Sequence, residues 1–118
     1  MCTRRDRVVQ EKKDATIFDR SVEARNKYVE KIISFVEPRN IYSLRVLVNC
    51  GNGAAGPTFN QVTQALESKG ADIEFINILN DPDPSFPHGI PNPLLEENQV
   101  LTSEAIKKNG ADLGVAFD

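Results

Sequence analysis

The chain has 118 residues, of which 40% are hydrophobic and 26% are charged, and its formal net charge is -3. This length suits one domain of the usual ~100–150 residues rather than two, and the charge balance gives no reason to expect nucleic acid as a partner. No segment approaches the ~20 apolar residues of a membrane span, and residues 1–14 lack the apolar stretch of a secretory signal, so we expect a cytoplasmic protein without membrane contacts.

The N-terminal residues are basic and poor in apolar side chains. Residues 1–31 carry nine Lys/Arg and six Asp/Glu, whereas residues 32–118 carry five and eleven. Such mixed charge is typical of a solvated helix or a mobile arm. We therefore expect residues 1–20 to form a leader or interdomain segment and residues 21–118 to form a single α/β domain.

Apolar residues at helical spacing predict a first helix that runs from Asp19 to a stop at Pro38, with Asp19 or Ser21 as its cap. The side chains expected on its apolar face are Val22, Tyr28, Val29, Ile32, Ile33 and Val36. The next segment, SLRVLVNC (residues 43–50), is a nearly continuous apolar run typical of a central strand covered on both faces. Its last residue, Cys50, is expected to be a buried free thiol, because Cys2 and Cys50 are too few for a disulfide framework or a zinc site.

The glycine turn GNGAAG (residues 51–56) leads into a second helix. We expect this helix to begin after Gly56, because Pro57 suits the first helical position and Thr58 with Gln61 matches a capping box. The helix ends at Gly70, where a left-handed residue belongs. Alternating apolar residues then predict a second strand in ADIEFINIL (residues 71–79).

The stretch NDPDPSFPHGIPNPLLEEN (residues 80–98) holds five of the seven prolines. This density excludes a helix or a central strand over residues 81–93 and predicts an ordered surface loop. A third helix follows in residues 94–110, with Glu96 and Glu97 favouring its N-terminal dipole and Gly110 at its end. GADLGVAFD (residues 110–118) is the third strand. Right-handed crossovers then assemble a three-layer α/β fold, a β-α-β-α-β unit of parallel strands. We predict the strand order 2-1-3.

Gly51, Gly53 and Gly56 formally match the dinucleotide-binding pattern G-x-G-x-x-G, with Asp81 near the end of the next strand. Two observations count against that interpretation. The predicted helix start lies too late for its positive end to meet a pyrophosphate, and Asp81 lies beyond the expected spacing of ~20 residues. A nucleotide-binding module that uses Gly51–Gly56 remains the alternative to a glycine turn that serves close packing.

Other residue types give little sign of chemistry. His88, the only histidine, stands among prolines without a nearby cysteine, and no serine lies in a G-x-S-x-G nucleophile elbow. The residues themselves therefore assign no catalytic or cofactor-binding side chain, and a domain that only binds a partner is a third interpretation.

Three motifs occur in an order that resembles a known family. VNCGNGAAGP (residues 48–57), FPHGIPNPLLEEN (residues 86–98) and GADLGVAFD resemble the second domain of the α-D-phosphohexomutases, and most closely the bacterial phosphomannomutases. The resemblance covers about Tyr28 to Asp118. It departs from the family at Pro84, where glycine is usual, and the local turn must differ because proline cannot adopt a positive φ.

The resemblance implies a metal site and an activity. Family members interconvert mannose 6-phosphate and mannose 1-phosphate through a phosphoserine and a bisphosphate intermediate, with Mg²⁺ held by the aspartates of a Gly-Asp-x-Asp-Arg loop. Asp118 matches the first of these ligands. We therefore expect Asp118 to be a metal ligand, the chain to end inside that loop, and the chain alone to bind Mg²⁺ weakly and to lack mutase activity. The sugar phosphate would bind only to the full-length protein, and the preference for mannose or glucose stays open.

The same resemblance bears on oligomeric state. In the family an antiparallel strand follows the metal loop, and we expect this chain to lack it. The last strand would then be an unprotected edge. We therefore expect a homodimer that forms by edge pairing through residues 113–117.

Overall fold

The computed structural model describes residues 15–118. The elements in chain order are α1 (Ser21–Ile33), the 3-10 helix η1 (Pro38–Asn40), β1 (Leu44–Asn49), α2 (Ala55–Ser68), β2 (Ile73–Ile78), α3 (Glu96–Asn109) and β3 (Leu113–Ala116). Most of the expected leader, residues 1–14, lies outside the described residues, and residues 15–20 form neither helix nor strand. The proposed division at residue 20 stays a prediction.

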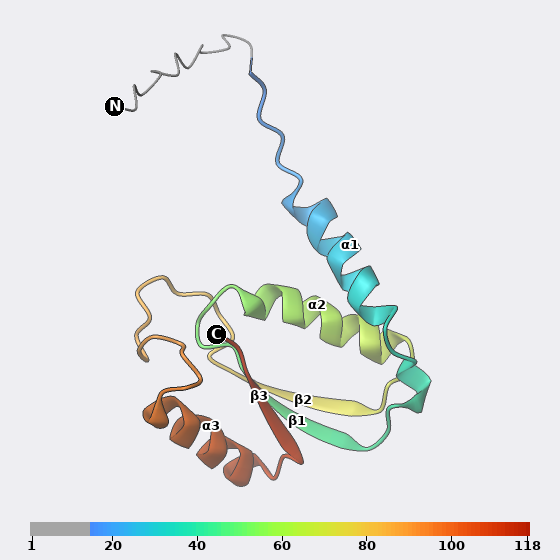
Figure 1. Ribbon diagram of the computed structural model, residues 1–118. Coiled ribbons are helices and arrows are strands. Elements are labelled where there is room, and N and C mark those ends of the chain that lie inside the picture. The colour runs from blue at the N-terminus through green and yellow to red at the C-terminus, as the bar shows by residue number, and fades with distance from the viewer. Residues whose placement is uncertain (1–14) are drawn as a thin grey trace, which may run out of the picture.

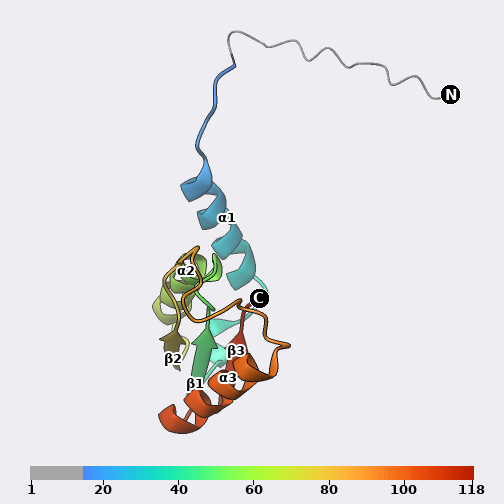
Figure 2. The ribbon, with the colours of Figure 1, turned by 90° about the vertical axis from the view of Figure 1, so that its left-hand side faces the viewer.

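The three strands form a parallel sheet in the order β2-β1-β3, which confirms the predicted topology. In this register Val46 of β1 lies opposite Phe75 of β2 and Leu113 of β3. Figure 1 shows α2 on one face of the sheet and α3 on the other, and the view in Figure 2 shows the same layers from the side. The predicted three-layer α/β fold is therefore confirmed.

The core is centred on β1, as expected for a strand covered on both faces. Leu47 and Val48 are fully buried, and so is the free thiol of Cys50, which confirms its prediction. Burial raises the pKa of the Cys50 thiol above its ordinary value.

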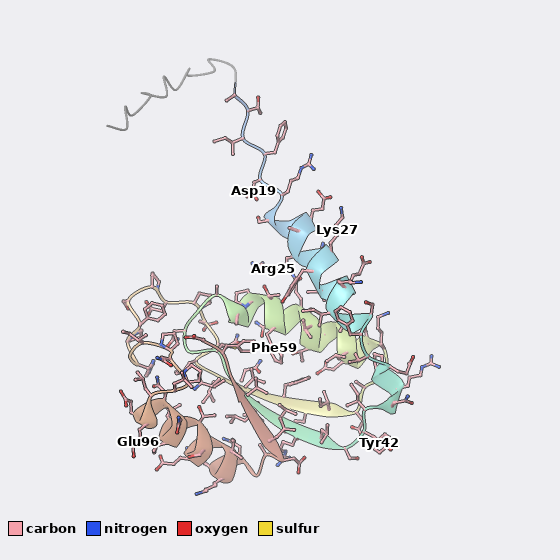
Figure 3. The ribbon with its side chains drawn as sticks, in the orientation of Figure 1. Asp19, Arg25, Lys27, Tyr42, Phe59 and Glu96 are labelled. Atoms are coloured by element: carbon pink, nitrogen blue, oxygen red, sulfur yellow. The ribbon has the colours of Figure 1, made fainter. Side chains whose placement is uncertain are left out.

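An aromatic cluster joins α2 to the two outer strands. Phe59, labelled in Figure 3, lies on α2. Its ring centroid is 5.2 Å from that of Phe75 on β2 and 5.9 Å from that of Phe117, just beyond β3. These rings pack against the buried side chains of β1. The end of β3 is therefore held in place by its contact with α2.

The first helix is shorter and more exposed than predicted. It ends at Ile33 instead of Pro38. Its N-cap position is Arg20, although the side chain of Asp19 accepts a hydrogen bond from the Ser21 N–H at 2.9 Å. Of the six predicted apolar-face residues only Val29 and Ile33 are buried, because α1 meets α2 over its C-terminal half and projects away from the sheet before that (Figure 1).

The predicted start of α2 is also wrong. The helix begins at Ala55 without a side-chain cap, so the expected capping box of Thr58 and Gln61 does not form. Pro57 is tolerated in the first turn because the first four N–H groups of a helix have no intrahelical partner. Gly56 therefore lies inside the helix, where a Cβ would stand 1.8 Å from the carbonyl oxygen of Asn80.

Two further boundaries differ at the C-terminal side. The third helix begins at Glu96 rather than Leu94, because Leu94 N–H donates to the side chain of Asn92 in a preceding turn. It ends as predicted at Gly110, which is left-handed. The third strand, expected within residues 110–118, spans only Leu113–Ala116, and it exposes the side chains of Leu113 and Val115.

None of the helices in residues 15–118 combines the length and the apolarity that crossing a lipid bilayer requires.

We predict that Gly56→Ala destabilises the fold. The added methyl group meets backbone rather than a flexible side chain, so the cost should be that of overpacking, about 1–3 kcal/mol in the free energy of unfolding. Urea unfolding followed by circular dichroism measures it. Gly53→Ala is the matched control, since its Cβ would lie 3.4 Å from the carbonyl oxygen of Cys50 and its φ is not positive. This variant should stay within about 0.5 kcal/mol of wild type. Equal stability of the two variants would contradict the prediction.

Candidate functional site

The carboxyl ends of all three strands lie along one edge of the sheet, because the strands are parallel. The loop between β2 and α3 crosses this edge, and the C-terminal end of the chain lies beside it (Figure 1). As predicted, the proline-rich residues 81–93 contain no helix or strand. In open α/β sheets ligands gather at this edge, so it is the candidate site.

The first glycine of the turn lies directly under the proline loop. Gly51 has a φ of 60°, and a Cβ at this position would stand 2.2 Å from the Cβ of Pro91. Only a residue without a side chain allows Pro91 to lie so close to the backbone. The proline loop therefore packs directly on the backbone of the glycine turn.

Asn52 holds the same loop by four hydrogen bonds. Its backbone N–H donates to the carbonyl of Leu79 at 2.8 Å, and its carbonyl accepts from Asp83 N–H at 2.9 Å. Its Nδ2 donates to the carbonyl of Asp81 at 3.0 Å, and its Oδ1 lies 3.1 Å from Nδ1 of His88. Because Oδ1 can only accept, Nδ1 of His88 carries the proton in this contact. His88 thus fastens the loop to the turn.

Asn49, the last residue of β1, ties three segments together. Its side chain is buried, donates from Nδ2 to the hydroxyl of Thr102 on α3 at 3.1 Å and accepts from Gly51 N–H at 2.9 Å. Its carbonyl accepts from Phe117 N–H at 2.9 Å. Phe117 is the residue before Asp118, so Asn49 sets the position from which Asp118 extends.

Asp118 is exposed at this edge and brings one side-chain carboxylate. A carboxylate oxygen is the ligand type that Mg²⁺ prefers, but an octahedral ion needs several. Within residues 15–118 no group of three or more His, Cys, Asp or Glu side chains is placed to hold a metal ion. The donor chemistry therefore fits magnesium, while the described residues do not make a complete site.

The dinucleotide interpretation has less support in the structure than in the sequence. Gly56 does allow close packing of helix and strand, and the expectation of a late helix start was wrong. However, Pro91 covers Gly51, and the cavity at this edge, lined by Asn49, Gly51, His88 and Phe117 among others, measures about 20 Å³. Small-molecule sites are typically ~300–1,000 Å³, so a nucleotide has no room above the turn.

Comparison with known proteins decides the family. Residues 26–118 match the family described as phosphoglucomutase/phosphomannomutase, alpha/beta/alpha domain II. The chain belongs to this phosphohexomutase family. The match begins within α1 and includes the glycine turn, the proline loop and Asp118, so all parts of the candidate edge lie inside it.

The relatives of this chain include bacterial phosphomannomutases. The chain is 42% identical over 99 residues to a phosphomannomutase of Salmonella typhimurium and 41% identical over 97 residues to one of Escherichia coli K12, covering 84% and 82% of this chain. A phosphoglucomutase/phosphomannomutase family protein from Burkholderia thailandensis matches 80% of this chain and 19% of its own, with 31% identity and a TM-score of 0.64. The chain spans about a fifth of the length of these curated relatives, 22% and 21%.

Sequence reasoning did not find Asn49 and Asn52. The available signals were a polar residue at the end of an otherwise apolar strand, and an asparagine between two glycines, where its tolerance of positive φ suits a tight turn. Asn52 has a φ of 56°. Both residues would have been recognised as loop anchors only with the position of residues 81–91 known.

We predict that nucleotides do not stabilise this chain. A ligand that binds only the native state at 100 times its Kd adds about 2.7 kcal/mol to the free energy of unfolding, which a thermal shift would detect. Because Pro91 occupies the space above Gly51, NAD or ATP should leave the Tm unchanged. A dose-dependent rise in Tm that Gly51→Ala abolishes would contradict this.

The proline loop contains a carboxylate with a perturbed pKa. Oδ1 of Asp83 accepts from the hydroxyl of Ser85 at 2.7 Å and from its N–H at 2.9 Å. These bonds, the hydroxyl first, hold the pKa of Asp83 below its ordinary value of 3.8, and the nearby His88 adds a smaller lowering. The folded-state pKa is thus below the unfolded one, so this turn is stabilising above pH 3.8 and loses its contribution as the pH falls through the folded-state pKa.

We predict that Ser85→Ala raises the pKa of Asp83 toward its ordinary value, because the variant loses the stronger of the two bonds. Carboxyl carbon NMR titration of both proteins measures the change. Ser103→Ala, which removes an exposed hydroxyl on α3, is the control and should leave Asp83 unchanged. Identical titration of Asp83 in the wild type and in Ser85→Ala would contradict the assigned cause.

Proposed function

We propose that this chain is the metal-loop domain of a cytoplasmic phosphomannomutase, an isomerase that interconverts mannose 6-phosphate and mannose 1-phosphate through a phosphoserine and a bisphosphate intermediate. The observation that carries the proposal is the position of Asp118. It lies two residues beyond the end of β3 at the carboxyl edge, inside the segment that matches domain II of the family. The relatives named phosphomannomutase support this substrate class.

The role of this chain is to supply and orient one metal ligand. Phe117 is fixed on two sides, since its N–H donates to Asn49 and its ring packs on Phe59. Asp118 is therefore attached to a rigid residue. Metal binding would mainly restrict the rotamers of the Asp118 side chain, since the backbone before it is already fixed. A rigid element holds ligand geometry better than a free loop.

The other ligands and the groups that bind sugar phosphate would come from the rest of a longer protein. Mg²⁺, when bound, would stabilise negative charge on the oxygens of the phosphoryl group in transit. Within this chain the proline loop covers the adjoining strand ends and keeps the glycine turn out of contact with ligands. No side chain in residues 15–118 is assigned a catalytic role in this proposal.

A chimera tests the proposal. Residues 26–118 replace the matching segment of the Salmonella typhimurium phosphomannomutase, and we expect the chimera to retain mutase activity. Asp118→Ala in the chimera should lower kcat/KM at least about 100-fold. Mutation of residues that only hydrogen-bond to metal ligands already lowers metal affinity or activity ~10–100-fold. Glu104→Gln, which neutralises an exposed carboxylate on α3, is the matched control and should leave the rate unchanged.

Two outcomes would contradict the proposal. One is an active chimera whose Asp118→Ala variant keeps its rate and its magnesium dependence. The other is mutase turnover by the purified 118-residue chain, which we expect to be inactive and to bind Mg²⁺ weakly because one carboxylate cannot complete an octahedral site.

A further inference from the structure

The chain contains two Asn-Gly dipeptides, Asn52-Gly53 in the glycine turn and Asn109-Gly110 at the end of α3. In such a pair the backbone nitrogen of the glycine can attack the side-chain amide of the asparagine, because glycine has no side chain that hinders ring closure. Asparagine counts among the thermolabile residues, and this reaction is one reason. The structure restrains the reacting groups of the two pairs to different degrees.

Both reacting groups of Asn52-Gly53 are held by hydrogen bonds. Nδ2 of Asn52 donates to the carbonyl of Asp81 at 3.0 Å, and Oδ1 lies 3.1 Å from Nδ1 of His88. The attacking nitrogen would be that of Gly53, whose N–H donates to the carbonyl of Cys50 at 2.9 Å. All three bonds must break before ring closure, so the proline loop protects this pair.

The corresponding groups of Asn109-Gly110 are held less firmly. Nδ2 of Asn109 donates to the carbonyl of Ala105 at 2.8 Å, whereas its Oδ1 accepts no hydrogen bond within the described part of the chain. The N–H of Gly110 is shared between the carbonyls of Ile106 and Lys107, and its distance to the latter is 3.3 Å, beyond the usual range. Gly110 is also exposed at a helix end, where helices fray.

We propose that Asn109 is a site of spontaneous deamidation in the folded chain. Hydroxide removes the proton of the Gly110 N–H, and the nitrogen forms a bond to Cγ of Asn109. The side-chain nitrogen takes a proton from water and leaves as ammonia, which regenerates the hydroxide. Water then opens the succinimide at either carbonyl and leaves aspartate or isoaspartate at position 109. Water is the only reagent consumed, and the side chain gains one negative charge.

The modification acts at the end of the sheet opposite to Asp118. The carbonyl of Asn109 accepts from Nη1 of Arg45 at 3.2 Å, and the N–H and carboxylate of Asp112 each bond the backbone of Arg45 at 2.8 Å. Isoaspartate lengthens the main chain just before this turn, and a carboxylate in the last turn of α3 is unfavourable for the helix dipole. The bonds that join the end of α3 to β1 should therefore weaken.

The proposal is independent of the proposed mutase function, and heavy-oxygen labelling of the 118-residue chain tests it. The chain is incubated in heavy-oxygen water at mildly alkaline pH, digested in acid and analysed by mass spectrometry, so that deamidation during handling carries no label. Label at position 109 should accumulate at least about 10-fold faster than at position 52, because two side-chain hydrogen bonds of Asn52 must first break. Asn109→Gln is the matched control. It keeps a side-chain amide but requires a larger ring, so it should lose the label at position 109 alone.

Two further measurements separate the effect of the fold from that of the dipeptide. His88→Ala removes one bond of Asn52 and should speed labelling at position 52 but not at position 109. In urea the wild type should take up label at similar rates at both positions, and this comparison decides if His88→Ala does not fold. Equal labelling of the two positions in the folded wild type, no label at position 109, or a difference that persists in urea would overturn the proposal.

Discussion

The close contact between Gly51 and Pro91 is the constraint on which the carboxyl edge of the sheet depends. The φ of 60° at Gly51 and its lack of a side chain allow the loop to lie directly on the turn after β1. Once Pro91 is seated there, Asn52 can bond Asp81, Asp83 and His88. A loop rich in proline also loses less backbone freedom on folding than an ordinary loop, so the contact orders a long connection at moderate entropic cost.

Asn49 connects the glycine turn at this edge to the last residues of the chain. A buried amide that lost a partner would cost about 1–3 kcal/mol. The side-chain oxygen and nitrogen of Asn49 each have a partner, Gly51 and Thr102, and its backbone carbonyl accepts from Phe117. The turn, α3 and the end of β3 are therefore coupled through one side chain and its backbone. Asp118 therefore extends from a residue that is held by a hydrogen bond and an aromatic contact, and such support suits a metal ligand.

The sequence predicted the architecture because its signals were local. Alternating or continuous apolar runs identified the strands, and right-handed crossovers gave their parallel arrangement, whereas the confirmed order β2-β1-β3 was one of several that such crossovers allow. The errors fall where tertiary contacts override local rules. Proline and a capping box argued for a helix start after Gly56, but α2 begins at Ala55, and Gly56 packs closely against the backbone of Asn80 from inside the helix. The exposure of Val22 and Val115 likewise depends on which elements lie above them.

The candidate site was less predictable than the fold. A glycine-rich turn has the same sequence whether a phosphate or a proline approaches its backbone, so only the position of Pro91 separates the two. Asp118 was named through family resemblance, since a single carboxylate has no metal-binding pattern of its own. The most direct measurement is anomalous scattering from Mn²⁺ in crystals of a full-length mutase that carries this segment. The account predicts a metal peak within about 2.3 Å of a carboxylate oxygen of Asp118, close to the ~2.0–2.1 Å of magnesium sites. A metal bound in that protein without contact to Asp118 would contradict it.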